Sequence, residues 1–231
     1  MSTPPYLIVG ASRGIGRSIA ERLVSQGRPV ITVARSPATV DGVMDHWTCD
    51  VVQDGLPAGL LPDSLAGMVY CPGTIDLKPL RSMRAEDMDL AWRVNVLGAF
   101  RCAQATADRL RKVPGSAMLF FSTVAVRQGM AFHASVASAK GGVEGLVRSL
   151  AAELVPSVRV NAIAPSLTAT PLAEKLLSTP EKAQALAERN PMKRLGTTDD
   201  MAAMAVMLLG PDAGWITGQV IAVDGGMSVL R

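Results

Sequence analysis

The sequence predicts a single α/β domain built on a parallel β-sheet that carries helices on both faces. Three observations support this prediction. Short apolar runs rich in β-branched residues alternate with longer stretches that have helical spacing. The runs are apolar at nearly every position, as in strands that are covered on both faces. A glycine-rich turn, GASRGIG at 10–16, joins the first run to the first helical stretch, and such alternation places the strands in one parallel sheet.

The predicted elements follow one another as such a sheet requires. We expect strands at residues 6–10, 29–35, 68–71, 117–122, 158–165 and 219–223. We expect helices at residues 14–27, about 84–111, 133–154 and about 198–209. The first helix shows the evidence most clearly, because apolar residues recur at Ile15, Ile19 and Leu23 and Gly27 supplies a stop signal. No repeat, low-complexity tract or linker interrupts the pattern, so residues 1–231 are predicted to form one domain.

Composition narrows the class of protein. The 231 residues suffice for one large domain with a buried core, and the 48% hydrophobic and 19% charged content is typical of a globular fold. The net charge is +3 with scattered arginines, so we expect no nucleic-acid partner. No apolar run approaches the ~18 residues of a membrane span, and no signal-peptide pattern opens the sequence. Cys49, Cys71 and Cys102 lack metal-ligand spacing, so we expect no metal, no membrane contact and a cytoplasmic location.

The glycine-rich turn indicates a nucleotide site. Gly10 allows a sharp turn, while Gly14 and Gly16 remove side chains where the backbone approaches a pyrophosphate and where helix packs on strand. The helix N-terminus then offers free N–H groups and a positive dipole end to the phosphates. Glycines are common in ordinary turns, but this turn lies between a strand and a helix, which strongly favours the dinucleotide interpretation.

Several ordered motifs resemble the short-chain dehydrogenase/reductase family of the classical type. They are GASRGIG at 10–16, CDV at 49–51, VNVLGAF at 94–100, AK at 139–140, VRVNAIAPS at 158–166 and GQVIAVDGG at 218–226. The resemblance covers nearly the whole chain. It implies a Rossmann-type doubly wound sheet of about seven strands, a nicotinamide cofactor and a small-molecule substrate. It also implies a homo-oligomer, a tetramer or a dimer, of which we expect the tetramer, and a substrate lid at 166–195.

The end of the second predicted strand favours NADP(H) over NAD(H). A carboxylate there would bind the ribose diol of NAD, but the strand ends in Ala34 and Arg35. Arg35 and Arg13 offer guanidinium donors suited to a 2′-phosphate, although both could also be ordinary solvated arginines. The segment 35–50 is too short for a full helix and its loops, so the family's helix there is expected to be reduced or missing. Matching the family, the predicted cofactor contacts are Gly10, Ser12, Arg13, Gly14, Ile15, Gly16, Arg35, Ser36, Asp50, Val51, Gly73, Asn95, Lys140, Ile163, Pro165, Thr168 and Thr170.

The resemblance also implies a catalytic set that is incomplete here. The family uses an asparagine, a serine, a tyrosine and a lysine, and Asn95 and Lys140 match the first and the last. The serine position, about thirteen residues before the tyrosine position, is occupied by Thr123, next to Ser122. Adjacent strand residues face opposite ways, so only one of these two enters the cleft, and we favour Thr123. Val136 stands in the tyrosine position, four residues before Lys140, and brings no proton.

His133 is the candidate substitute for the missing proton donor. If the helix already includes it, His133 shares a face with Val136 and Lys140, and histidine is the commonest general acid near neutrality. A partly exposed histidine at a helix start is the simpler interpretation. Three functions therefore stay open. The first is reduction of a carbonyl with a proton from His133 or from a water on Lys140, and the second is reduction of a C=N or conjugated bond, as in a pterin. The third is catalytically silent NADP(H) binding or assembly on the same fold.

Overall fold

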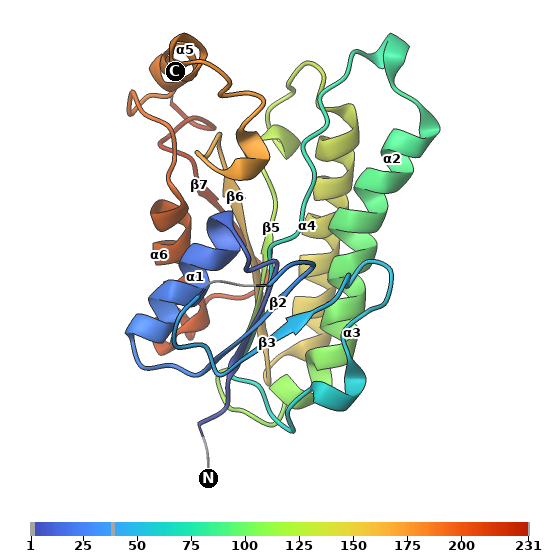
Figure 1. The fold of residues 1–231 in the computed structure, drawn as a ribbon, viewed down its shortest axis with the longest axis vertical. Helices are drawn as coiled ribbons and strands as arrows, with labels where there is room; N and C mark the ends of the chain where they lie inside the picture. Colours follow the sequence, from blue (N-terminus) through green and yellow to red (C-terminus); the bar gives the residue numbers. More distant parts are fainter. Residues whose placement is uncertain (1–2, 38–39, 231) are drawn as a thin grey trace.

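The computed structural model describes residues 3–37 and 40–230. These residues form a seven-stranded parallel sheet of order β3-β2-β1-β4-β5-β6-β7, shown in Figure 1. Its strands are β1 (Tyr6–Val9), β2 (Val30–Ala34), β3 (Asp45–Thr48), β4 (Gly67–Tyr70), β5 (Ala117–Phe121), β6 (Arg159–Pro165) and β7 (Val220–Val223). The strand order reverses between β1 and β4, and doubly wound sheets bind ligands in the crevice at the carboxyl ends beside such a reversal. The doubly wound single-sheet fold is thereby confirmed.

Helices cover the sheet on both faces (Figure 1). One face carries two helices that pack against each other, α1 (Gly14–Ser25) and α6 (Thr198–Leu209). The other face carries α2 (Ala85–Trp92), α3 (Gly98–Leu110) and α4 (Ala134–Leu154). The helix α5 (Pro180–Glu188) belongs to a segment that stands beyond the carboxyl ends of the strands. The reversal of strand order between β1 and β4 therefore lies between α1 on one side and the α2–α4 layer on the other.

Two apolar clusters, one on each face of the sheet, form the core. Leu7 and Val9 of β1 belong to the cluster that includes α3 and α4, whereas Ile8 between them belongs to the cluster that includes α1 and α6. Because successive strand residues point to opposite faces, a strand covered on both sides is expected to be apolar at nearly every position. This requirement explains the continuous apolar runs that predicted the fold.

Two elements differ from the sequence prediction. The helix expected at 84–111 is divided, because a π turn, η3 (Arg93–Leu97), lies between α2 and α3. The helical spacing of apolar residues continues across the turn. The sequence pattern therefore could not indicate that the backbone hydrogen bonds change there from α-helical to π-helical. The strand β3, DHWT, has no predicted counterpart, since it lies at the sheet edge and only Trp47 in it is buried. Between β2 and β3, the described residues 35–37 and 40–44 form no helix, as the short spacing predicted.

Two further findings concern the described residues as a set. None of their helices combines the length and the apolar character that a membrane crossing requires. Within the same residues, no three His, Cys, Asp or Glu side chains are grouped so that they could hold a metal ion.

Candidate active site

The glycine-rich turn lies at the reversal of strand order and meets two other loops there. Gly10 follows β1 with φ of +85°, and a β-carbon on it would lie 2.9 Å from Cδ of Pro72 in the loop after β4. A β-carbon on Gly14 would lie 3.8 Å from Cβ of Thr170, beyond the end of β6. Three loops that are far apart in the sequence therefore converge around the start of α1, where a bound nucleotide would contact all of them.

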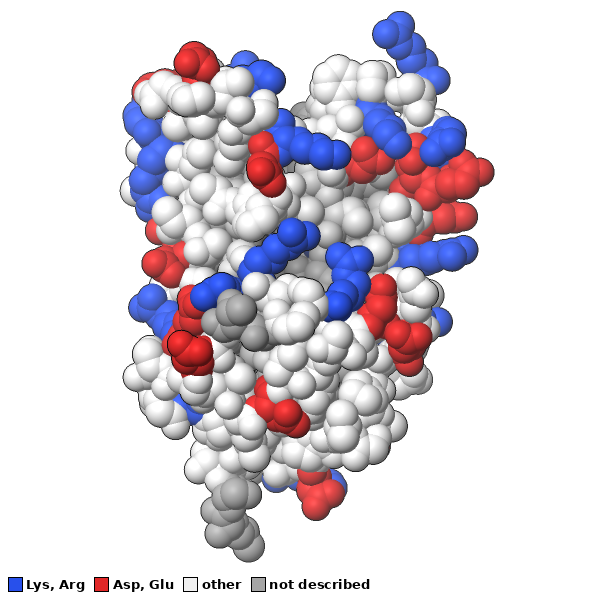
Figure 2. Space-filling view, viewed as in Figure 1, with Lys and Arg blue, Asp and Glu red and all other residues white. Residues whose placement is uncertain are grey.

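The start of α1 is open to an anion. Its N-cap residue, Arg13, makes no side-chain capping bond, and the first turn contains no acidic residue. The first N–H groups of the helix and its positive dipole end are thus available. The side chains of Arg13 and Arg35 are exposed, and neither forms a hydrogen bond or an ion pair with any residue in 3–37 or 40–230. Figure 2 shows basic side chains bordering a hollow at this end of the sheet.

The other predicted cofactor contacts flank the crevice at different depths. Ser36 follows β2 and is exposed, while Asp50 and Val51 follow β3, and one carboxylate oxygen of Asp50 accepts a hydrogen bond from N of Val52 at 2.9 Å. Ile163 lies inside β6 and is 0% exposed, which leaves its side chain no accessible surface for a ligand. The remaining candidates on this side lie at or beyond the end of β6, and they are Pro165, Thr168 and Thr170.

Asn95, Lys140 and Gly73 come together from three different elements. A β-carbon on Gly73 would lie 3.2 Å from Oδ1 of Asn95 and 3.3 Å from Nζ of Lys140. Lys140 is buried on α4, and its ammonium donates to the carbonyl of Phe121 at 2.8 Å. Since an ammonium has three N–H donors, two remain for other partners. Glycine at position 73 keeps the space between the amide and the ammonium open.

Asn95 carries an unused acceptor into this space. Its Nδ2 donates to the carbonyl of Ala91 at 2.8 Å and to Oγ1 of Thr74 at 3.1 Å. Its Oδ1 is buried and has no hydrogen-bond partner among the described residues. A buried acceptor without a partner is unfavourable unless a ligand or a water uses it. The free Oδ1 beside the free donors of Lys140 therefore indicates a place that a ligand hydroxyl group fits.

Burial changes the acidity of Lys140. Desolvation lowers the pKa of its ammonium from the ordinary value of 10.5 to about 8, and the thiol of Cys71 opposes this shift. The ammonium is therefore mostly protonated at neutral pH but gives up its proton far more readily than a solvated lysine. A group with such a pKa can both hold a ribose and transfer a proton.

The two hydroxyl residues at the end of β5 have different partners. Ser122 is buried and donates to Oε1 of Glu144 at 2.8 Å, which commits its hydroxyl to α4. Oγ1 of Thr123 accepts a bond from N of Ala125 at 3.3 Å, and its own proton has no acceptor in the described residues. Thr123 is thus the residue of this pair that keeps a hydroxyl donor for a substrate.

Val136 and His133 lie at the beginning of α4. Val136 is buried, one turn before Lys140. His133 is the N-cap residue and precedes the helix, so the condition under which all three residues would share a helix face is not met. The Nδ1 atom of His133 lies 2.8 Å from the carbonyl of Ala131, so this nitrogen carries the ring's proton in the neutral form and Nε2 is left as the exchangeable site.

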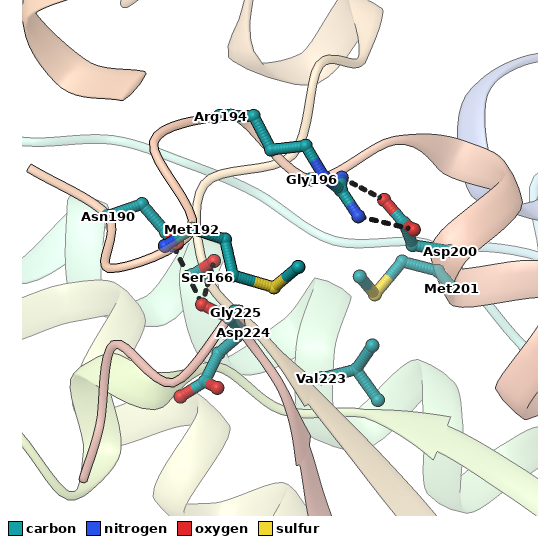
Figure 3. Close-up of a pocket in the computed structure, with 10 residues that line it drawn as sticks. All are labelled: Ser166, Asn190, Met192, Arg194, Gly196, Asp200, Met201, Val223, Asp224 and Gly225. Atoms are coloured by element: carbon teal, nitrogen blue, oxygen red, sulfur yellow. Dashed lines mark hydrogen bonds and ion pairs between the residues drawn. The ribbon is translucent and has the colours of Figure 1, made fainter. Parts of the chain in front are cut away.

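The segment predicted as the lid has its two ends joined to each other and bonded to neighbouring elements. Near its start, Thr168 forms a β-bridge with Gly196, which follows its end. Nδ2 of Asn190 donates to the carbonyl of Asp224 at 2.7 Å, and Arg194 forms a bidentate pair with Asp200 at 2.6 and 2.9 Å. Figure 3 shows Asn190, Arg194, Asp200 and Asp224 around a cavity, whose volume is about 150 Å³. These polar groups already bind one another. The bonds around the cavity therefore hold the segment in place.

Three groups in the site had no role in the sequence interpretation. They are the hydroxyl of Tyr70, the hydroxyl of Thr74 and the carbonyl of Phe121, which bind Val94, Asn95 and Lys140 respectively. Tyr70 had the signal of an ordinary strand residue, and backbone carbonyls have no sequence signal at all. Their contribution appears only when the strands and helices are placed together.

Comparisons with known proteins agree with this geometry. A family model described as Enoyl-(Acyl carrier protein) reductase matches residues 10–228. The chain is 34% identical to Short-chain reductase protein NovJ of Streptomyces niveus, over 95% of this chain and 92% of that protein. It is 30% identical to L-xylulose reductase of Bos taurus, over 95% and 94% of the two chains.

Solved structures give the same result. Ligand-free aldohexose dehydrogenase of Thermoplasma acidophilum superimposes with a TM-score of 0.92 at 26% identity, covering 99% of this chain and 95% of that one. Pseudomonas aeruginosa RhlG, solved as an active-site complex with NADP, gives 0.90 at 27% identity, covering 99% and 98%. With the family model, the curated relatives and the fold in agreement, the chain belongs to the short-chain dehydrogenase/reductase family, whose members are oxidoreductases that use a nicotinamide cofactor.

Proposed function

We propose that the protein is an NADP(H)-dependent reductase of a small molecule, with Val136 in the place of the family's tyrosine. The observation that carries this proposal is the approach of Lys140 and Asn95 to Gly73 at the carboxyl end of the sheet. Burying a lysine without an anionic partner lowers stability. A scaffold that only bound a partner protein would gain nothing from retaining this buried ammonium, whereas an oxidoreductase uses it.

The residues around the crevice fit NADP(H). The free N–H groups of α1 would hold the pyrophosphate, Arg13 and Arg35 the 2′-phosphate, and Lys140 the nicotinamide ribose. Bound there, the cofactor supplies a hydride to the substrate. The relative RhlG, solved with NADP, supports the same choice of cofactor.

Cofactor preference can be reversed at one position. The wild type is expected to bind NADPH about tenfold or more tightly than NADH, because an arginine–phosphate contact contributes roughly 1.5–3 kcal/mol. Arg35→Asp should reverse the preference, since a carboxylate repels the 2′-phosphate and accepts bonds from a ribose diol. Arg22→Asp, an equal charge change at the exposed far end of α1, should leave it unaltered. Equal affinity of the wild type for both cofactors, measured by fluorescence titration, would contradict the assignment.

Two kinds of substrate agree with the site. For a carbonyl, the hydroxyl of Thr123 would polarise the oxygen, and the proton would come from Lys140, through a water, or from His133. For a C=N or conjugated bond, as in a pterin, the buried Val136 would form an apolar wall, and no carbonyl oxygen would need a proton from the enzyme. An iminium ion accepts the hydride without any added proton, whereas a neutral C=N or conjugated bond would take its proton from solvent. The description of the matching family model as an enoyl reductase gives the second kind specific support.

Turnover assays separate these alternatives. NADPH oxidation would be followed with panels of ketones, cyclic iminium compounds, dihydropterins and conjugated enones, at the same protein concentration. Turnover with any of these substrate classes supports the proposed function and identifies the bond that is reduced. Tight NADPH binding without turnover across the panels would replace it with the silent cofactor-binding function.

We also propose that the protein assembles as a homotetramer in the cytoplasm. Trp92 is 50% exposed and Phe100 41% exposed along the α2–α3 layer, and Trp215, beside the edge strand β7, is 100% exposed. Two separate apolar surfaces fit two different two-fold interfaces, which together make a tetramer. Light scattering at micromolar concentration should give four times the chain mass, and Trp215→Glu should reduce it to a dimer. A monomeric wild type would contradict this assembly.

A further inference from the structure

The π turn that carries Asn95 leaves one carbonyl without its usual partner. In an α-helix, N of Gly98 would bind the carbonyl of Val94, four residues earlier. Here N of Gly98 binds the carbonyl of Arg93 instead. The Val94 carbonyl, one residue before Asn95, thereby loses its α-helical donor. The π turn therefore needs another donor for the Val94 carbonyl, because a buried carbonyl without a donor is unfavourable.

Tyr70 supplies that contact from the sheet. It is the last residue of β4, it is buried, and its hydroxyl donates to the carbonyl of Val94 at 2.6 Å. Burial raises the pKa of Tyr70 far above its usual range, so the hydroxyl stays a donor at all physiological pH values. Gly98 makes the approach possible, because a β-carbon there would collide with this hydroxyl.

We infer that Tyr70 is a positioning residue: its hydroxyl selects the π turn over a continuous α-helix and so directs the Asn95 amide toward Gly73 and Lys140. Because one helical residue corresponds to about 100° of rotation, an α-helical turn would move the Asn95 side chain away from Thr74. Tyr70 also lies only three residues before Gly73 in the chain. It therefore connects the π turn that carries Asn95 with the loop that carries Gly73. This inference rests on the proposed function, in which Asn95 serves the reaction.

Tyr70→Phe tests the inference because it removes the hydroxyl and keeps the ring. The expected result is a decrease in kcat of about tenfold, the effect of losing one buried hydrogen bond. KM and the Kd for NADPH should change less than kcat, because Lys140 and the residues proposed for the pyrophosphate and the 2′-phosphate are unaltered and only the Asn95 contact is displaced. Met68→Ala is the control, since Met68 is buried on the same strand in the same cluster but has no hydroxyl that could bind the Val94 carbonyl. An equal decrease in kcat for the control at matched stability would show a merely structural role and overturn the inference.

A second variant, on the helix, disrupts the same bond between the Tyr70 hydroxyl and the Val94 carbonyl. Gly98→Ala should displace the Tyr70 hydroxyl and lower kcat as Tyr70→Phe does. Once the hydroxyl is absent, the extra methyl group has less to displace, so the double variant should lose less than the product of the two single effects. Effects that multiply fully would mean that the two residues act independently, which would also overturn the inference.

A structural measurement separates this inference from the proposed function. The crystal structure of Tyr70→Phe is expected to contain a bond from N of Gly98 to the carbonyl of Val94 and a displaced Asn95 amide. An unchanged π turn would refute the positioning role even if the wild type is an active reductase. Conversely, a wild type without turnover would remove the proposed function, while the conformation of the variant would still decide whether Tyr70 holds the turn.

Discussion

Replacing Val136 with tyrosine is expected to raise carbonyl reduction by ~10²–10⁴-fold, the usual contribution of a positioned general acid. Val136 is buried on α4 one turn before Lys140, so a phenol there would lie on the same helix face as the ammonium. Steady-state NADPH oxidation with the best ketone of the panel measures the gain. Val136→Phe, which has the same bulk without the hydroxyl, should give no gain, and an equal rise in both variants would contradict the explanation.

The same variant distinguishes the two substrate classes. A substrate with a C=N or conjugated bond should gain nothing from the phenol and could be excluded by its size, because overpacking a buried site generally disturbs it. His133→Ala completes the comparison. If His133 gives the proton, this change lowers turnover and leaves NADPH affinity intact. Activity that survives both changes would favour the C=N or conjugated-bond reaction.

Lys140→Met is expected to lower turnover by about 100-fold or more. The same variant is expected to be more stable than the wild type at neutral pH. In the wild type, burial holds the pKa of Lys140 at about 8, below its ordinary value of 10.5. Below pH 8 the folded protein carries the whole penalty of the buried charge, on the order of 3 kcal/mol. Between pH 8 and 10.5 the unfolded chain binds more protons than the folded one, so the free energy of unfolding rises with pH and the penalty disappears.

Chemical denaturation across this pH range measures the prediction. The stability advantage of Lys140→Met over the wild type should be full at pH 7 and should vanish near pH 10.5. Lys112→Met, at an exposed position, is the control and should show no such pH dependence. A variant that is less stable than the wild type at pH 7 would show that the ammonium has an unrecognised favourable partner.

The parts of the fold that depend on apolar periodicity could be predicted, and those that depend on hydrogen-bond register could not. The buried strands needed apolar residues at nearly every position, so β1 and β5 were evident from the sequence. The edge strand β3 buries only Trp47 and left no comparable pattern. Likewise, the motif spacing indicated Asn95 and Lys140. The π turn, and the bond that its Val94 carbonyl accepts from Tyr70, arise from long-range packing. Tyr70 lies 24 positions from Val94, a separation over which local patterns carry no information.

The short connection between β2 and β3 has a consequence for the kinetics of cofactor exchange. On this side, the adenine end of a bound nucleotide would be bordered by residues 35–37 and 40–44, which form no helix. The other end would lie beneath the segment whose two ends are joined by the Thr168–Gly196 bridge. A used cofactor could then leave adenine end first without waiting for the anchored segment to open. In such a protein, the exchange of oxidised for reduced cofactor and the exchange of product for substrate would take place at two separate openings, with independent rates.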